Sequence, residues 1–231
     1  MNEDMENDEN FEKKDKTVVL PGDSIIESME YLPGRNCFRE GNSIISKRLG
    51  LAHFKGHVIE VVPLSGMYVP EVGDMVIGEV AEVQHAGWVI DINSPYQAFL
   101  PLSGVAEFID PAKTDMAKIY RKGDVIYGKI LLVSPAKSIH ISMQAPKTRK
   151  FTGGRILSIS PVKVPRLIGK QGSMINLIKD KTGCMISVGQ NGLIWLQGEN
   201  EELAANAINE IEKKSHVEGL TDHIEKMLSR K

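Results

Sequence analysis

Two glycines three residues apart, Gly169 and Gly172, bracket a short basic turn in the C-terminal third of the chain. Glycines at this spacing let backbone amides come close to a phosphate group, and the charge of Lys170 attracts the same group. Turns alone often produce this spacing, so the flanking sequence decides its meaning. Apolar residues follow the turn at helical spacing, at Ile175 and Ile178, and a strand pattern precedes it. The pattern favours a loop that binds the phosphate backbone of a nucleic acid.

The residues beside the two glycines have expected roles in such a site. Lys170, Gln171 and Arg166 would hold phosphates against the amides of the loop, while Ile168 would line an apolar groove for bases. Ile175 is expected to belong to the core instead. A lysine at the tip of a loop has little structural use, so Lys170 is the strongest candidate for a contact.

Positive charge gathers around this turn, although the 231-residue chain carries a net charge of -2. Between residues 146 and 199, nine lysines and arginines face two carboxylates. Arg155 and Lys163 belong to this group and could extend a phosphate track, although such charges often form only a solvated face. Residues 1–16 instead hold seven acids against three lysines, which predicts a disordered acidic tail.

The elements that must position the turn are predicted to form a module over residues 146–215. Strands are expected over 155–160, 184–188 and 193–197, and helices over 165–168, 173–181 and 200–214. Gln190-Asn191-Gly192 is expected to supply the positive dihedral angles of the hairpin between the last two strands. The order strand, helix, helix, strand, strand, helix, with the glycine turn between the first two helices, resembles the type I KH domain, an RNA-binding fold. Residues 216–231 are expected to form a C-terminal helix or tail.

A second module is predicted over residues 67–145. Two similar segments, 73–80 and 123–130, each combine a turn with an apolar strand that has a glycine at its centre. A central glycine allows the strong bend that closing a small barrel requires. Further strands are expected over 88–92, 98–102 and 138–143, with an insertion at about 104–120. Five short strands of this kind favour a five-stranded OB-fold barrel.

The N-terminal module, residues 17–66, is predicted to be a small all-β barrel or sandwich, because glycines punctuate short apolar runs about every ten residues. His53 and His57 have a spacing that would suit a metal on a helix, but no third ligand is near, so incidental histidines are expected. Cys37 and Cys184 are expected to be reduced. The predicted fold class is multidomain, β plus α/β.

The composition is that of an ordinary soluble protein, with 42% hydrophobic and 25% charged residues. No run of eighteen apolar residues occurs, and the acidic N-terminus does not resemble a secretory signal, so a cytoplasmic protein with no membrane partner is expected. The sequence also lacks a Ser/His/Asp order, a metal cluster, paired carboxylates and a Walker loop. We therefore expect no catalytic residues, no metal site and no cofactor.

Taken in order, a glycine-rich β module, an OB-fold of the type named for ribosomal protein S-one and a single KH domain resemble the archaeal exosome RNA-binding cap subunit. The segments that carry the resemblance are Leu20-Pro21-Gly22-Asp23, Asp91-Ile92-Asn93-Ser94-Pro95-Tyr96, Ala98-Phe99-Leu100-Pro101 and the glycine loop. The resemblance implies that three copies, or a mixed trimer with another cap protein, sit on a hexameric ring of phosphorolytic RNase subunits. It further implies a non-catalytic subunit that binds single-stranded RNA and guides its 3′ end into the pore. The turn Gly189-Gln190-Asn191-Gly192 is structural in that family.

Two further expectations follow from the resemblance. Residues 17–66 are the natural part for docking on the ring, because they have no RNA-binding signature. In the barrel, Val89 and Pro101 stand where the wider family commonly offers a stacking phenylalanine and a histidine. Trp88 does not replace them, because strand parity places it on the core side. The exposed candidates for steering the RNA backbone are Tyr96, Arg121 and Lys122, with loop solubility as the alternative reading for all three.

A free-standing RNA-binding regulator of translation or transcription is the alternative function, because the same two domains could act without a nuclease. Domain order separates the chain from polynucleotide phosphorylase, which places KH before the OB-fold and carries its catalytic domains in the same chain. Stoichiometric recovery of ring subunits with the native protein would distinguish a cap subunit from a regulator.

Overall fold

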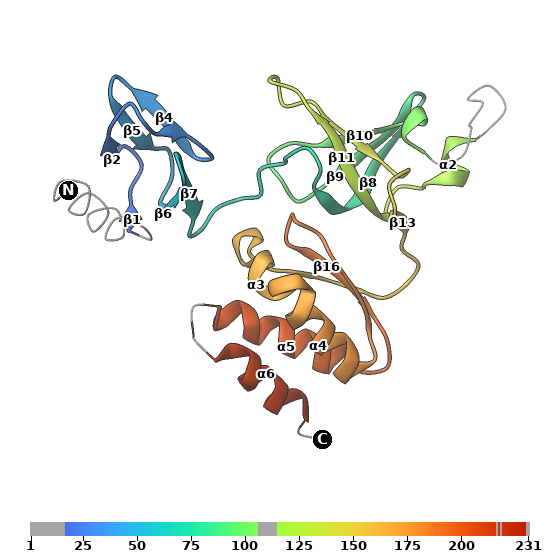
Figure 1. Ribbon diagram of the computed structural model, residues 1–231. Coiled ribbons are helices and arrows are strands. Elements are labelled where there is room, and N and C mark those ends of the chain that lie inside the picture. The colour runs from blue at the N-terminus through green and yellow to red at the C-terminus, as the bar shows by residue number, and fades with distance from the viewer. Residues whose placement is uncertain (1–16, 106–114, 216, 218, 230–231) are drawn as a thin grey trace. The chain divides into compact units, whose positions relative to one another are not determined.

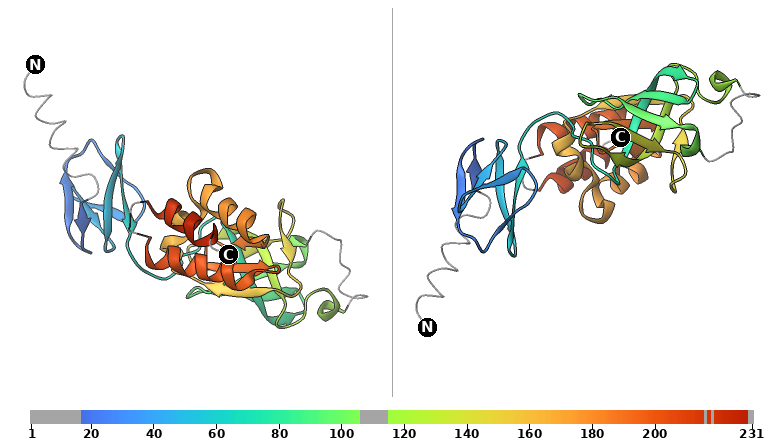
Figure 2. Two further views of the ribbon diagram at one scale, coloured as in Figure 1. Left: turned by 90° about the horizontal axis from the view of Figure 1, so that it is seen from below. Right: turned by 90° about the horizontal axis from the view of Figure 1, so that it is seen from above.

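The computed structural model describes residues 17–105 and 115–229, apart from residues 216 and 218 (Figure 1, Figure 2). The expected acidic tail and most of the expected insertion lie outside the described residues. The chain divides into two compact units, Met1–Gly66 and Met67–Lys231. The second unit combines the predicted barrel with the KH module. None of the described helices is long and apolar enough to cross a membrane.

The first unit is a sandwich of two small sheets. One sheet has the order β1-β6-β7-β3 and the other the order β2-β5-β4. Their strands are β1 (Val18–Val19), β2 (Ser24–Glu27), β3 (Leu32–Pro33), β4 (Cys37–Glu40), β5 (Ser43–Ser46), β6 (Gly50–Lys55) and β7 (Val58–Pro63). Both sheets share one core, since Ile44 of β5 and Ile59 of β7 are fully buried in the same cluster. The predicted all-β module is thereby confirmed.

The histidines and cysteines of the sequence have structural surroundings. His53 belongs to β6 and His57 to the turn before β7, so the two do not share a helix face. Within residues 17–105 and 115–229, no group of three potential metal ligands occurs. Cys37 and Cys184 are both free and buried, and burial raises the pKa of the Cys37 thiol. A thiol in such surroundings is inert, so both cysteines serve packing.

The second unit begins with a closed five-stranded barrel. Its strands are β8 (Met75–Gln84), β9 (Gly87–Asp91), β10 (Ala98–Pro101), β11 (Val125–Val133) and β12 (Ile139–Ser142). They follow the order β12-β10-β9-β8-β11, and the pairing of β12 with β11 closes the barrel. Three short elements accompany them, namely η1 (Leu102–Gly104), α2 (Met116–Ile119) and β13 (Arg149–Lys150). The predicted OB-fold is confirmed. In the structure, β10 also pairs with β12 in parallel.

The central glycines of β8 and β11 allow close packing inside the barrel. A Cβ atom at Gly78 would lie 2.5 Å from Ile90 Cγ2, and one at Gly128 would lie 2.4 Å from Ile141 Cγ2. Both distances are far below van der Waals contact, so a larger residue would displace a fully buried side chain. The glycine that the two similar segments share therefore leaves room for the barrel core.

The rest of the second unit is a three-stranded sheet with helices on one face (Figure 1). Its elements are β14 (Arg155–Ser158), η2 (Pro161–Lys163), α3 (Val164–Ile168), η3 (Lys170–Gly172), α4 (Ser173–Thr182), β15 (Met185–Val188), β16 (Leu193–Gln197), α5 (Glu201–Lys213) and α6 (Leu220–Ser229). The sheet has the order β14-β16-β15 with antiparallel pairs. This topology confirms the type I KH prediction.

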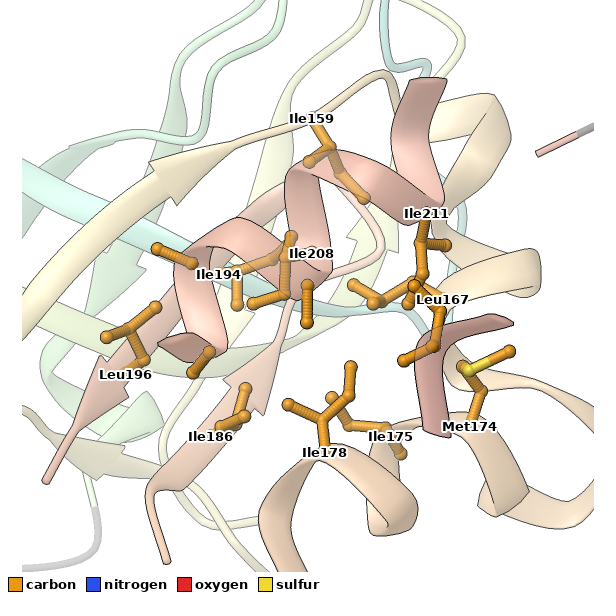
Figure 3. Close-up of a cluster of buried hydrophobic side chains, with 14 of the residues drawn as sticks. Ile159, Leu167, Met174, Ile175, Ile178, Ile186, Ile194, Leu196, Ile208 and Ile211 are labelled. Carbon is orange, nitrogen blue, oxygen red and sulfur yellow. The ribbon is translucent and has the colours of Figure 1, made fainter. Parts of the chain in front are cut away.

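The KH core includes the last helix, which the sequence suggested only as a helix or tail. Leu220, Ile224 and Leu228 recur every four residues along α6 and are at most 5% exposed. They belong to the same hydrophobic cluster as Ile178 of α4 and Ile211 of α5, part of which Figure 3 shows. Helix α6 therefore stabilises the same core as the helices that flank the glycine loop.

The turn between β15 and β16 differs from the prediction. Gly192 has a φ of 83°, but neither Gln190 nor Asn191 has a positive φ, so the expected set of positive angles is wrong. The side chain of Asn191 is fully buried. It accepts a hydrogen bond from the Ile77 amide at 3.3 Å and donates to the carbonyl oxygens of Ile77 and Ile92, at 2.6 and 2.8 Å. Asparagine is needed here because its amide joins the KH hairpin to the barrel backbone.

Aromatic rings continue this junction between barrel and KH domain. Trp195 of β16 stacks on Phe151 with ring centroids 4.3 Å apart, and Phe151 stacks on Tyr127 of β11 at 6.1 Å. Trp195 Nε1 donates to the Gly153 carbonyl at 2.8 Å, and the Tyr127 hydroxyl donates to the Val188 carbonyl at 3.1 Å. Burial raises the pKa of Tyr127, so this hydroxyl stays a donor. The two domains therefore share a packed and hydrogen-bonded interface.

Candidate nucleic-acid interface

The glycine loop joins α3 to α4 in a conformation that requires its glycines. Gly169 has a φ of 73° and a ψ of 175°, and Gly172 has a φ of 81°. A Cβ atom at Gly169 would lie 2.9 Å from both the Cβ and the amide nitrogen of Met174. Any other residue would therefore be strained at Gly169 by its backbone angles and by a clash. Gln171, between the glycines, also has a positive φ, of 52°.

The loop ends at the N-terminus of α4, a helix of ten residues. Gly172 is the N-cap residue, and no side chain accepts a hydrogen bond at that cap. The Ser173 amide donates to the Lys170 carbonyl, while the other amides of the first turn have no partner inside the helix and carry the positive end of its dipole. Lys170 and Gln171 are exposed at the tip of the loop. These groups together suit an anion such as a phosphodiester.

The other predicted cations near the loop have structural partners. Arg166 Nη2 donates to the Val217 carbonyl at 3.1 Å, and Lys163 Nζ donates to the Glu212 carbonyl at 2.8 Å. Both hydrogen bonds tie the segment before the loop to the end of α5 and the residues that follow it. Arg155 is exposed at the first residue of β14, on the sheet. The loop itself therefore holds Lys170, while these three cations lie on the elements around it.

The two isoleucines beside the loop differ in burial. Ile175 is 7% exposed and packs inside the KH core (Figure 3), as expected. Ile168 is half-buried at the end of α3 and packs against the edge of the same core. Part of its side chain thus reaches the surface beside Gly169. A contact between Ile168 and a base stays a prediction.

The outer face of the barrel carries two aromatic side chains that sequence reasoning missed. Trp88 is fully buried, and its Nε1 donates to the Tyr120 carbonyl at 2.9 Å, as expected for a core residue. On the other side of the strand, Val89 pairs with Phe99, which in turn pairs with His140. The rings of Phe99 and His140 are half-buried, with centroids 6.1 Å apart. A row of side chains from β9, β10 and β12 thus crosses the barrel surface.

This row changes the interpretation of the barrel. The sequence suggested a missing stacking platform, because a valine stands at position 89. In the structure, Phe99 lies one strand away from Val89 and presents a ring on the same surface. Strand alternation contained the signal, since Ala98 and Leu100 are buried and the residue between them must point outward.

The remaining predicted residues lie in loops of the barrel. Tyr96 is 36% exposed, and Lys137 Nζ lies 5.8 Å from the centroid of its ring. Arg121 and Lys122 are exposed in the turn before β11. The Tyr96 loop joins β9 to β10, whereas Arg121 and Lys122 follow α2. These three residues therefore belong to two different loops.

Asp124 fixes the turn that carries the two cations. Its carboxylate accepts hydrogen bonds from the Arg121 amide, at 2.7 Å, and from the Lys150 ammonium. Burial raises the pKa of Asp124, but these hydrogen bonds outweigh burial and hold the pKa below its ordinary value. The carboxylate therefore neutralises Lys150, while Arg121 and Lys122 keep their charged ends toward solvent.

Comparison with known proteins finds relatives of the whole chain and of both domains. The family described as RRP4, S1 domain, matches residues 67–131, and the KH domain family matches residues 154–213. Exosome complex component Rrp4 of Thermococcus kodakarensis is 44% identical over 221 residues, which cover 93% of this chain and 86% of the relative. Exosome complex component Rrp4 of Methanothermus fervidus is 40% identical over 219 residues, covering 94% and 97%. A crystal structure assigned as an exosome complex RNA-binding protein is 36% identical, with a TM-score of 0.64, and covers 71% of this chain and 95% of its own.

Proposed function

We propose an RNA-capture role for this chain, which belongs to the Rrp4 family of exosome complex components. In this proposal the chain binds single-stranded RNA in the cytoplasm and caps a hexameric ring of phosphorolytic RNase subunits. Three copies, or a mixed trimer with another cap protein, guide the 3′ end of the RNA into the pore. Repeating two weak RNA-binding domains threefold raises avidity without any tight single site.

The glycine loop is the observation that carries the proposal. An uncapped helix N-terminus, two glycines with positive φ and an exposed Lys170 come together at one point. Backbone amides at such a point bind phosphate without reading the base, while the apolar surface at Ile168 offers a place for a base. A capture site of this kind accepts many RNA sequences, as a general degradation complex requires.

The outer face of the S1 barrel supports a second contact with the same strand. Phe99 and Tyr96 offer rings, and base stacking on an aromatic ring contributes about 1–3 kcal/mol per base. We expect Phe99→Ala to weaken binding of single-stranded RNA about fivefold. Phe38→Ala, which removes a ring that is 37% exposed in the first unit, is the matched control and leaves the affinity unchanged. Equal affinities of the Phe99→Ala variant and the unaltered chain in a fluorescence-anisotropy titration would remove the barrel face from the proposal.

Docking on the ring is assigned to the first unit. Val18, Leu51 and Val62 form a row across β1, β6 and β7 on the side opposite the core. Val18 is 57% and Val62 is 45% exposed, and Leu20 and Leu64 add further exposed aliphatic surface. Exposed apolar surface of this kind is typical of a protein interface and unsuited to RNA phosphates.

Recovery of the native protein with its partners tests the proposal. A pull-down from native extract followed by mass measurement of the intact complex is expected to show ring subunits in stoichiometric amount. The chain alone is expected not to degrade RNA, and phosphate-dependent trimming by the highly purified chain would contradict a non-catalytic role. Recovery of the chain without any RNase subunit would favour the free-standing regulator instead.

A further inference from the structure

An exposed arginine lies on the aromatic stack between the S1 barrel and the KH sheet. Arg149 Cζ lies 5.1 Å from the centroid of the Phe151 ring and 5.2 Å from that of Trp195. Arg149 Nη2 also donates a hydrogen bond to Ser187 Oγ at 2.8 Å. The guanidinium is therefore held in place by three side chains, although Arg149 is exposed to solvent. Pre-organisation of this kind lowers the entropy lost when a ligand binds.

The charge of Arg149 is available to a partner. Among the ion pairs of the described residues, none involves Arg149. Residues 147–155 and strands β14, β15 and β16 contain no acid, and Lys147 adds a cation two residues before Arg149. The other two cations of that segment do not add to this charge, because Lys150 is paired with Asp124 and Arg155 pairs with Leu196 on the helix side of the sheet. The hydrogen bond to Ser187 uses one of the five N–H donors of the guanidinium. The surroundings of Arg149 therefore favour an anionic ligand.

This surface lies on the opposite side of the KH sheet from the helices. Ile194 and Leu196 of β16 face the core beneath the helices, so Trp195 between them points to the other face. The glycine loop connects two of those helices, α3 and α4. Arg149, stacked on Trp195, is thus on a different face of the domain from the glycine loop.

Apolar side chains accompany the arginine on that face. Ile156 of β14 and Ser187 of β15 both pair with Trp195, and Ile156 is 38% exposed. Met185 lies two residues from Ser187 on the same side of β15 and is 55% exposed. A fixed guanidinium binds a phosphate through two parallel hydrogen bonds, and a base can stack on its plane or on the apolar surface.

We propose that Arg149, with Ile156 and Met185, forms a further RNA contact on the face of the KH sheet that lies opposite the helices, beside the junction with the barrel. The ligand is a nucleotide of a single strand, held by its phosphate and by its base. This contact rests on the proposed RNA-binding function and adds a site to it that the glycine loop does not contain. A strand that contacts both sites passes around the edge of the KH sheet.

Salt-dependent binding of a fluorescein-labelled single-stranded RNA to the full chain tests the proposal. Arg149→Ala is expected to weaken binding about fivefold and to reduce the slope of log affinity against log salt by about 0.7, the loss of one phosphate contact. Arg149→Lys keeps the charge but lacks the planar guanidinium, and its affinity for the RNA is expected to be about twofold lower. Lys226→Ala, which removes an exposed lysine of α6, is the matched control and leaves both quantities unchanged.

The outcomes distinguish a contact of Arg149 with RNA from a purely structural role of Arg149 between the two domains. If Arg149→Ala lowers thermal stability but leaves affinity and salt slope unchanged, Arg149 only joins the domains or serves a protein partner, and the inference is overturned. Lys170→Glu in the same titration distinguishes this failure from failure of the proposed function. If Lys170→Glu weakens binding and Arg149→Ala does not, the proposed RNA contact at the glycine loop stands and the one at Arg149 is overturned. No RNA binding by the unaltered chain would overturn both.

Discussion

Gly169→Asp combined with Lys170→Glu is expected to lower the affinity of the chain for single-stranded RNA about thirtyfold. The aspartate meets Met174 at 2.9 Å and is forced into a backbone conformation that glycine alone adopts without strain, so the amides of the loop move. The two new carboxylates also repel a phosphate that the Lys170 ammonium attracted. Titration of labelled RNA against the full chain measures the loss.

The matched control places the same two changes on α6 and the residue before it. Gly219→Asp combined with Lys226→Glu alters the charge equally and also replaces a glycine with positive φ, of 70°. Affinity is expected to remain within twofold of the unaltered chain, about the experimental scatter for a distant surface change. Lys170→Glu alone, which leaves the glycines in place, separates the effect of charge from a distorted loop. Full affinity in both loop variants would show that RNA binds elsewhere on the chain.

Asn191→Leu is expected to destabilise the second unit by about 3 kcal/mol or more. Leucine has a similar size but leaves the Ile77 amide and the carbonyl oxygens of Ile77 and Ile92 without their partner. A buried polar group that loses its hydrogen bond costs about 1–3 kcal/mol, and three such groups are affected. Urea unfolding followed by tryptophan fluorescence measures the change, since Trp88 lies in the barrel and Trp195 in the junction.

Gln190→Ala is the matched control for the turn. Gln190 contributes its backbone amide, which donates to the Met75 carbonyl at 2.8 Å, and alanine keeps that donor. The stability of this variant is expected to stay within about 0.5 kcal/mol of the unaltered chain. An Asn191→Leu chain that unfolds at the same urea concentration as Gln190→Ala would mean that the buried amide contributes nothing to the junction.

Local patterns predicted the elements of the KH domain because each pattern has a local cause. The helix after the glycine loop begins at Ser173, as predicted, because Gly172 ends the turn there and Ile175 and Ile178 follow at helical spacing. The role of Asn191 could not be predicted in this way, since its partner Ile77 is 114 residues away. A turn residue whose side chain bonds to another domain leaves no trace in the periodicity of the neighbouring strands.

Two other features of the structure have a local signal in the sequence. Alternation around Phe99 places its ring on the outer face of the barrel, although the valine at position 89 suggested that this face lacks a stacking ring. In α6, Leu220, Ile224 and Leu228 have the spacing of a buried helix face, although the sequence was interpreted only as a C-terminal helix or tail with no part in the core. Arg149 is a different case, because its rigid placement depends on Trp195 and Ser187, which only the tertiary structure brings to it.

The stack of Tyr127, Phe151 and Trp195 limits how the second unit can be divided. A chimera that exchanges the KH domain with that of a relative at residue 145 or 146 would transfer Phe151 and Trp195 but leave Tyr127 and Ile77 behind. Unless the incoming rings and the buried asparagine fit the resident barrel, the hybrid would expose aromatic surface and aggregate. The S1 barrel and the KH domain are therefore expected to coevolve, with substitutions on one side of their interface matched by substitutions on the other.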